Sequence, residues 1–138
     1  MKPKINYHYT IYHKEVDTFN FIQYNYLVDE TCYYDRVMTH INTIIEHLLD
    51  RPNSRQEVIV THKQFKNYAC LISLQFQIVN NRLVVIANFR SQCAINGRPN
   101  DTPMLQYIAT QVMRRVGVRR FIIYVNVGNY HENLGLNV

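Results

Sequence analysis

Three groups with useful chemistry lie within one stretch of this 138-residue sequence, between Tyr68 and Asp101. Cys70 offers a thiol, Arg90 with the adjacent Ser91 offers a clamp for an anion, and Asp101 offers a carboxylate. A guanidinium can make two parallel, charge-assisted hydrogen bonds to a phosphate, and a thiolate is a nucleophile. Whether these groups form one site depends on the elements that carry them.

Two of these residues also have a plainer explanation. A lone cysteine at the start of an apolar strand is more often a small buried hydrophobe than a nucleophile, and this applies to Cys70. An arginine at a strand end often forms a surface salt bridge, which contributes little to stability. The functional interpretation is stronger for Arg90, because an Arg-Ser pair beside a turn has little reason to pack.

The pattern around these residues predicts a β-hairpin. Apolar residues alternate with polar ones over 70–79 and again over 82–89, as in half-buried strands. Asn80 and Asn81 separate the two runs, and asparagine tolerates the positive φ that a two-residue hairpin turn requires. We therefore expect Arg90 and Ser91 at the exit of the second strand, followed by a turn over 97–100.

A helix is predicted directly after that turn. Asp101 or Thr102 is a good N-cap, with Pro103 at or near the first helical position. The helix is expected to run to about Val116, where Gly117 ends it. Its expected buried residues are Met104, Leu105, Ile108, Val112 and Met113.

The rest of the chain completes a mixed pattern of strands and helices. We expect a strand over 5–12, a helix over 33–50, a strand over 57–61 and a strand over 119–127. A further strand over 21–28 remains open, and 128–138 is expected to be a polar terminal loop carrying His131. This order predicts an α+β fold with one domain over 1–138, a mostly antiparallel or mixed sheet covered by two main helices.

The composition of the sequence bears on where in the cell the protein acts. No apolar run approaches the ~20 residues needed to span a bilayer, and the N-terminus lacks the apolar core of a signal peptide. Cys32, Cys70 and Cys93 are far apart and odd in number, so we expect no disulfide framework and no metal site. A reducing compartment such as the cytoplasm fits best.

The basic excess and the tyrosines could each serve a partner. The formal charge is +5, and the arginines Arg114, Arg115, Arg119 and Arg120 cluster near the expected end of the second helix. We attribute this cluster to favourable contacts with the helix C-terminus rather than to nucleic-acid binding. Tyrosines are dense over 7–34, which fits either strand packing or a surface for a protein partner or a second copy.

Several segments, in their order, resemble the core of the thymidylate synthase superfamily, which includes pyrimidine-nucleotide hydroxymethylases. The segments are LLDRPNSRQEVIV, then Cys70, then RSQCAINGRPND and GNYHENL, and together they span roughly 34–134. The most specific feature is the twenty-residue step from Cys70 to Arg90, which such enzymes keep between nucleophile and phosphate arginine. The resemblance implies a thymidylate synthase-like fold, and the family is common in bacteriophage genomes.

The resemblance also implies roles for individual residues. Cys70 matches the nucleophile that attacks C6 of a pyrimidine, and Arg90 and Ser91 match residues that grip the 5′-phosphate. Arg55 matches an arginine that the family donates across a two-fold dimer, which implies a homodimer. His131 matches a histidine near the sugar.

Asp101 departs from the family members that act on uracil, which place asparagine at this turn. An amide can donate to O4 and accept from N3–H, whereas a carboxylate accepts from the exocyclic amine of cytosine. Cytidylate hydroxymethylases of the family carry aspartate there. The resemblance therefore implies CMP or dCMP as the ligand rather than dUMP.

Other departures weaken the case for catalysis. Gln56 stands where a second phosphate arginine is usual, Cys93 where an aspartate is kept, and Asn133 where a tyrosine holds the sugar. The sequence has no tryptophan to stack on folate, and we find no glutamate relay or N-terminal arginine loop. It also ends soon after His131, so we expect no segment that closes over folate.

Two hypotheses follow. The first is a compact family member that binds a pyrimidine nucleoside monophosphate or a protein partner, without catalysis and without a certain cofactor. The second is an active folate-dependent dCMP hydroxymethylase or synthase-type transferase, which would use Cys70 and methylene-tetrahydrofolate. A nucleic-acid-binding domain is a weaker third hypothesis, and we expect no membrane association. If the gene is viral, the host cytoplasm would be the location.

Overall fold

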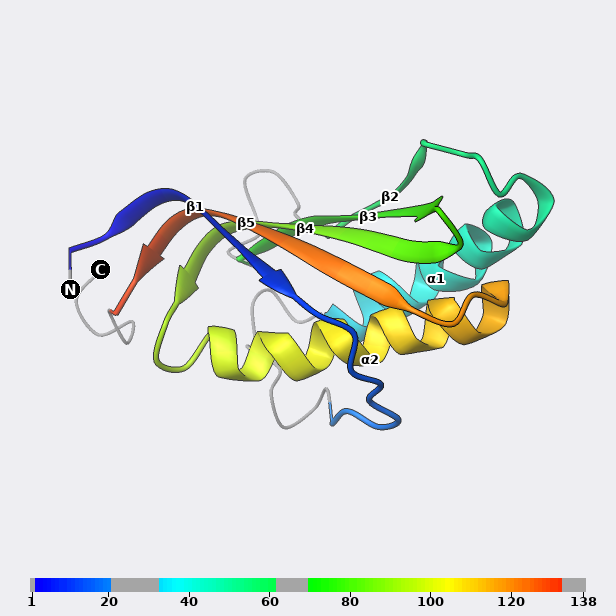
Figure 1. Cartoon of the computed structure of the whole chain (residues 1–138). Helices are drawn as coiled ribbons and strands as arrows, with labels where there is room; N and C mark the ends of the chain where they lie inside the picture. Colours follow the sequence, from blue (N-terminus) through cyan, green and yellow to red (C-terminus); the bar gives the residue numbers. More distant parts are fainter. Residues whose placement is uncertain (1, 21–32, 62–69, 133–138) are drawn as a thin grey trace.

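The computed structural model describes residues 2–20, 33–61 and 70–132, which form a sheet and two helices (Figure 1). The strands are β1 (Lys4–Ile11), β2 (Glu57–Val60), β3 (Leu71–Val79), β4 (Arg82–Cys93) and β5 (Phe121–His131), and the helices are α1 (Tyr33–Asp50) and α2 (Arg98–Val116). Both helices lie on the same face of the sheet. The expected α+β class, with a sheet covered by two main helices, is confirmed. The strand expected over 21–28 lies outside the described residues.

The sheet is mixed, in the order β1-β5-β4-β3-β2. Its pairs are antiparallel except β4 with β5, which run parallel. Two parallel neighbours need a crossover connection, and α2 supplies it. The end of β4 and the start of α2 therefore lie together at one edge of the molecule, next to the end of β5 (Figure 1).

The hairpin between β3 and β4 forms as predicted. Asn80 and Asn81 have φ values of 52° and 60°. However, β4 continues to Cys93 instead of ending near 89, so Arg90 and Ser91 lie within the strand and not beyond its end. Pairing with β5 explains the extension, because the two parallel strands stay in register up to Cys93 and His131.

The predicted start of α2 was wrong. The helix begins at Arg98 after Gly97, and no side chain caps it. Pro99 fits the first turn, where a missing N–H costs nothing, and Pro103 lies inside the helix. Asp101 is therefore a buried first-turn residue and not an N-cap.

The predicted end of α2 is confirmed, and the predicted end of β5 is wrong. Gly117 adopts a left-handed conformation with φ 84°, and its N–H bonds to the carbonyl of Met113. In contrast, β5 starts at Phe121 and runs to His131, so His131 belongs to a strand and not to a loop. This places His131 beside Cys93 of β4.

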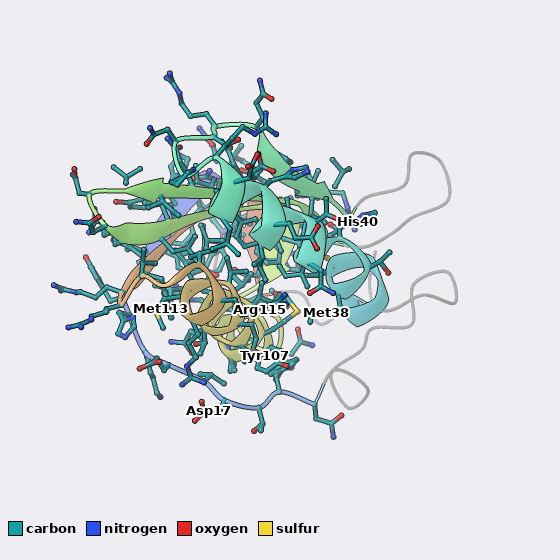
Figure 2. The ribbon with its side chains drawn as sticks, turned by 90° about the vertical axis from the view of Figure 1, so that its right-hand side faces the viewer. Asp17, Met38, His40, Tyr107, Met113 and Arg115 are labelled. Carbon is teal, nitrogen blue, oxygen red and sulfur yellow. The ribbon has the colours of Figure 1, made fainter. Side chains whose placement is uncertain are left out.

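The core lies between the sheet and the helices. All five residues expected to be buried on α2 are buried, together with the inward side chains of β3, β4 and β5. Met38 of α1 and Tyr107 of α2 are partly buried against this core, under the sheet (Figure 2). In the part of the chain described, neither helix has the length and apolar character to cross a membrane.

The basic residues at the end of α2 make specific contacts. Arg114 lies 3.0 Å from Glu15 and 2.7 Å from Asp17, and Arg115 donates a hydrogen bond to the side chain of Asn42 on α1. Figure 2 labels Asp17 and Arg115 on this side of the molecule. Half of the four-arginine cluster thus holds the N-terminal segment and α1 against the end of α2.

Candidate functional site

Cys70 and Arg90 meet where β3 begins. Cys70 immediately precedes β3, and its carbonyl accepts a 2.7 Å hydrogen bond from the backbone N–H of Arg90. Nη2 of Arg90 also lies 3.8 Å from Sγ of Cys70. Burial raises the pKa of the Cys70 thiol, and the Arg90 guanidinium offsets part of that effect. The group is therefore a thiol near neutral pH in the free protein, partly enclosed and beside a cation.

Asp101 approaches the same place from the first turn of α2. Its side chain is 6% exposed, and Oδ2 accepts a 3.0 Å hydrogen bond from Nε2 of Gln92. Among the described residues, Oδ1 has no hydrogen-bond partner. Burial raises the pKa of Asp101 to about 6, while the bond from Gln92 opposes this shift. Asp101 also lies close enough to Cys70 for its charge to raise the pKa of that thiol.

Ser91 and His131 form the third part of the site. They sit on the neighbouring strands β4 and β5, and Nε2 of His131 lies 2.9 Å from Oγ of Ser91. The backbone carbonyl of His131 accepts a 2.7 Å hydrogen bond from the N–H of Ala94, which fixes the ends of the two strands. The fold thus brings Cys70, Arg90 and Asp101 together at one end of the sheet, and the Ser91–His131 pair lies at the same end of β4 and β5.

In β4 and β5 the regular alternation of buried and exposed residues changes near the strand ends, and this change determines where the side chains of the site point. Along β4 every second residue is buried as far as Phe89, and then Gln92 is buried instead of following the same alternation. In β5 the same change occurs between Val127 and Tyr130. At this point a Cβ on Gly128 would lie 2.8 Å from the carbonyl oxygen of Arg90, so only glycine fits there without a shift.

The change of alternation turns Gln92 toward a group of aromatic residues that sequence reasoning missed. Oη of Tyr9 donates a 2.7 Å hydrogen bond to Oε1 of Gln92. The guanidinium of Arg98 lies 3.8 Å from the centre of the Tyr9 ring and donates a 3.3 Å bond to the hydroxyl of Tyr130. The ring of Tyr7 stacks on that of Tyr130 at 4.5 Å. These tyrosines contact residues of the same chain, so this part of the Tyr-rich region contributes to strand packing.

Arg55 does not join this cluster. It is exposed in the turn between α1 and β2. Glu57, two residues later, pairs with Phe76 in the second half of β3, whereas Cys70 precedes that strand. The turn carrying Arg55 therefore lies at the opposite end of the sheet from the connection between β4 and α2 (Figure 1).

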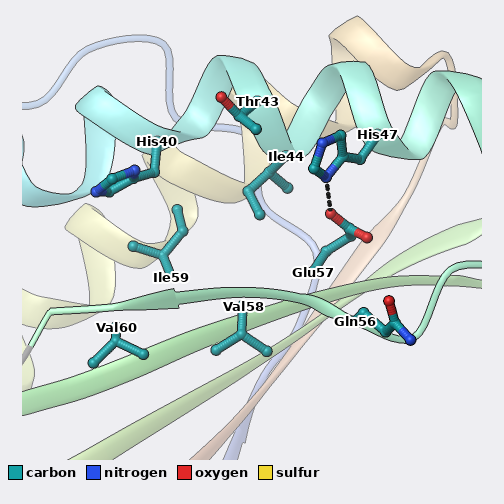
Figure 3. Close-up of a pocket in the computed structure, with 9 residues that line it drawn as sticks. All are labelled: His40, Thr43, Ile44, His47, Gln56, Glu57, Val58, Ile59 and Val60. Carbon is teal, nitrogen blue, oxygen red and sulfur yellow. Dashed lines mark hydrogen bonds and ion pairs between the residues drawn. The ribbon is translucent and has the colours of Figure 1, made fainter.

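The turn that carries Arg55 is held by a buried carboxylate. Oε1 of Glu57 lies 2.7 Å from Nδ1 of His47, and its Oε2 accepts a hydrogen bond from Ser54. Burial of Glu57 disfavours its charge, but these two hydrogen bonds outweigh that effect and lower its pKa. A groove of about 380 Å³ lies alongside, between α1 and β2 (Figure 3). Because both oxygens of Glu57 are occupied, we interpret this group as structural.

Two of the residues that depart from the family pattern, Gln56 and Cys93, lie within the described part of the chain. Gln56 is exposed and lines the groove in Figure 3, away from Cys70. Cys93 is 8% exposed and lies at the end of β4. Asn133 lies outside the described residues. Within those residues, no three His, Cys, Asp or Glu side chains gather closely enough to hold a metal ion.

The arrangement can hold an anion and a polar ring next to a thiol. Arg90 and Ser91 provide donors at the strand edge, and Asp101 provides a carboxylate oxygen that needs a partner. An unpaired buried carboxylate is costly, so such a group usually marks a functional site rather than a contribution to stability. In chemical terms the site combines a thiol, a cation and a hydroxyl with a carboxylate that can accept a further hydrogen bond.

Comparison with known proteins agrees with the fold. The sequence matches no family model and no curated protein. Among solved structures, the two-layer α+β arrangement is similar to that of one phage protein. That structure is thymidylate synthase from T4 phage, with a TM-score of 0.64 and 18% identity over 70% of this chain. The chain spans 36% of that protein, so the likeness shows a thymidylate synthase-like fold and no more.

Proposed function

We propose that this chain carries a pocket for a pyrimidine nucleoside monophosphate, with a preference for CMP or dCMP, and that it acts by binding. The observation that carries the proposal is the Asp101 carboxylate, which is buried near the Cys70 thiol and whose Oδ1 has no hydrogen-bond partner within the described part of the chain. Keeping such a group folded costs free energy unless a ligand satisfies it. The exocyclic amine of cytosine is a suitable donor.

The phosphate would bind near the C-terminal end of β4, beside the base. Arg90 is exposed there, Ser91 bonds to His131, and His131 would contact the sugar. A guanidinium and a hydroxyl together can donate several hydrogen bonds to one phosphate. Oδ1 of Asp101 would then accept from the base. A reduced Cys70 fits a cytoplasmic protein, including one in a host cytoplasm.

A second copy of the chain would supply a further arginine, its Arg55, to the phosphate-binding residues. The sheet face opposite the helices carries exposed apolar residues on several strands, namely Val58, Val60, Ile72, Val79 and Tyr124. Arg55 lies too far from Cys70 to act on the same ligand within one chain. A two-fold dimer through this face would cover the apolar residues and would allow Arg55 to approach the partner's site.

Binding is favoured over catalysis by the state of the thiol and by the missing groups. The nucleophile would be the thiolate, and burial keeps the pKa of Cys70 raised in the free protein. Methylene-tetrahydrofolate fits the residues present poorly, because Cys93 is a buried thiol and the sequence has no tryptophan. A protein partner at the Tyr-rich region is compatible with a binding role.

Calorimetry with dCMP and dUMP tests the proposed pocket. We expect dCMP to bind more tightly than dUMP, and Arg90→Ala to weaken dCMP binding by about 1.5–3 kcal/mol, the range for a hydrogen bond to a charged group. Arg82→Ala is the matched control, because Arg82 is an exposed arginine at the other end of β4. Tighter binding of dUMP, or equal losses in both variants, would contradict the proposal.

The transferase alternative is supported by one contact, the Arg90 guanidinium 3.8 Å from the Cys70 sulfur, which favours the thiolate. Addition of that thiolate to C6 of the pyrimidine would let the hydrogen on C5 exchange with water, and elimination would restore the thiolate. Release of tritium from C5-labelled dCMP, lost in Cys70→Ala, would establish this activity. Absence of release in the wild-type protein would support binding alone.

A further inference from the structure

An unbroken chain of hydrogen bonds runs from β1 through β4 to α2. Oη of Tyr9 donates to Oε1 of Gln92 over 2.7 Å, and Nε2 of Gln92 donates to Oδ2 of Asp101 over 3.0 Å. Gln92 is 1% exposed and Asp101 is 6% exposed, so water has little access to either group. The Gln92 amide therefore serves as a connector with one accepting end and one donating end.

The direction of this chain follows from the chemistry of its ends. If the amide of Gln92 were reversed, its carbonyl would face Asp101, which would then need a proton. Its NH₂ group would face Tyr9, which would have to accept. Burial raises the pKa of the Tyr9 hydroxyl far above its ordinary value, so Tyr9 keeps its proton and donates it. The carboxylate of Asp101 is thus the acceptor at the far end.

The Tyr9 ring is itself held in place. The Arg98 guanidinium lies 3.8 Å from its centre, and Arg98 also donates to Tyr130. A cation over the ring face is attractive, and the two-point contact of Arg98 limits how the ring can move. The donor at the start of the chain therefore has a fixed position relative to α2, which carries both Arg98 and Asp101.

We propose that Tyr9 and Gln92 are positioning residues that determine base specificity, because they keep Asp101 as a hydrogen-bond acceptor whose free oxygen recognises an amino group on the pyrimidine. This inference rests on the proposed nucleotide pocket. A carboxylate held in this way accepts from the amine of cytosine and repels the O4 carbonyl of uracil. A protonated carboxyl would both donate and accept, much as an amide does, and would discriminate poorly.

Two titratable groups bear on Asp101 electrostatically. Cys70 reaches it from the start of β3 and Tyr9 from β1, and both are neutral while their pKa values stay raised. Arg98 and Tyr130 act on Tyr9 in turn. The hydrogen bond from Gln92 is the contact that opposes the effect of burial on Asp101. Loss of that bond should shift the carboxyl toward its protonated form.

The test compares Tyr9→Phe and Gln92→Leu with Tyr7→Phe as the control. Tyr7 lies on the same strand, stacks on Tyr130 and forms a hydrogen bond with Arg98, but it makes no contact in the chain from Tyr9 through Gln92 to Asp101. The first readout is the titration midpoint of the Asp101 carboxyl, measured by carbon NMR in the ligand-free protein. We expect this midpoint to rise by about one pH unit in Gln92→Leu, by less in Tyr9→Phe, and not at all in the control.

The second readout is the ratio of dCMP to dUMP affinity at pH 7, which should fall by roughly ten-fold in Gln92→Leu. Unchanged midpoints in both variants would overturn the inference, whether or not nucleotides bind. A shifted midpoint with an unchanged ratio would overturn the role in specificity. If the wild-type protein bound neither nucleotide, the proposed pocket and its specificity would both be overturned, while a shifted midpoint would still show that the chain of bonds holds the carboxylate.

Discussion

The unusual residue of this molecule is Asp101. Most buried carboxylates are paired with a cation or accept several hydrogen bonds, but among the residues that the structure describes this one accepts a single bond, from the neutral Gln92. Burial raises its pKa to about 6, so near neutral pH the charged form is maintained against its environment. In the proposed function, a ligand that donates a hydrogen bond to Oδ1 would recover this free energy.

The pH dependence of stability should reveal this cost. Because the folded pKa of Asp101 is raised from 3.8 to about 6, the folded state binds the proton more tightly between these values and loses stability as the pH rises through them. At about 1.4 kcal/mol per pH unit, the loss amounts to about 3 kcal/mol. We therefore expect Asp101→Asn to be more stable than the wild type at pH 7.5 and nearly equal to it at pH 4.

Urea unfolding of both proteins at several pH values measures this difference. Glu57 titrates with the opposite sign, because its lowered pKa makes it stabilising above its unfolded value and less so as the pH falls. That contribution is the same in both proteins and cancels in the comparison. A constant difference between the two proteins from pH 4 to 7.5 would show that Asp101 is not destabilised by burial.

The strands β4 and β5 position the site by leaving their regular alternation. Strict alternation predicted the hairpin correctly, since it holds from Leu83 to Phe89. It failed at the ends of both strands, where Gln92 and Tyr130 turn inward and where Gly128 allows close approach to Arg90. The strand ends could not be read from the sequence because parallel pairing across the α2 crossover extends them.

Substitution of Gly128 should disturb the site through the backbone. A Cβ in Gly128→Ala would meet the carbonyl oxygen of Arg90 at 2.8 Å, so the strands must separate. We expect a loss of about 1–3 kcal/mol in stability, typical of overpacking, and weaker dCMP binding. Thermal unfolding and calorimetry measure the two effects.

Gly117→Ala is the matched control for this prediction. Gly117 also needs its glycine, with φ 84°, but a Cβ there meets nothing within 4 Å. The Gly117→Ala variant should lose about 1 kcal/mol of stability through backbone strain alone and should keep the dCMP affinity of the wild type. If Gly128→Ala and Gly117→Ala lost dCMP affinity equally, the close approach of β5 to β4 at Gly128 would not determine the position of Arg90.

The molecule as a whole presents a sheet with helices on one face and exposed apolar residues on the other. Tyr124 on the interior strand β5 is 38% exposed, and Val60 on the edge strand β2 is 65% exposed. An apolar surface of this kind is typical of a contact with another protein, and in the proposed dimer a second copy would cover it.

The proposed dimer can be tested by sedimentation. We expect the wild-type protein to sediment as a dimer, and Tyr124→Lys to shift it toward the monomer because a charge would be buried in the contact. Leu49→Lys is the control, because Leu49 is 57% exposed on α1, on the helical side of the molecule. A monomeric wild type, or equal effects of both substitutions, would contradict the dimer.

The sequence predicted the α+β class and both helices. Local patterns carry this information, because helical and strand periodicities and turn residues act over a few positions. It did not predict that Tyr9 reaches Gln92, since that contact joins β1 to β4 and depends on the placement of β5 between them. Long-range pairing decides such contacts, and a single sequence does not display it.

The most direct test of the proposed pocket is a crystal structure of the protein with dCMP. We expect the phosphate beside Arg90 and Ser91, with the exocyclic amine within hydrogen-bond distance of Oδ1 of Asp101. We also expect C6 of the base to face the sulfur of Cys70. A site that stays empty at high dCMP concentration, or a base bound with its amine away from Asp101, would contradict the account.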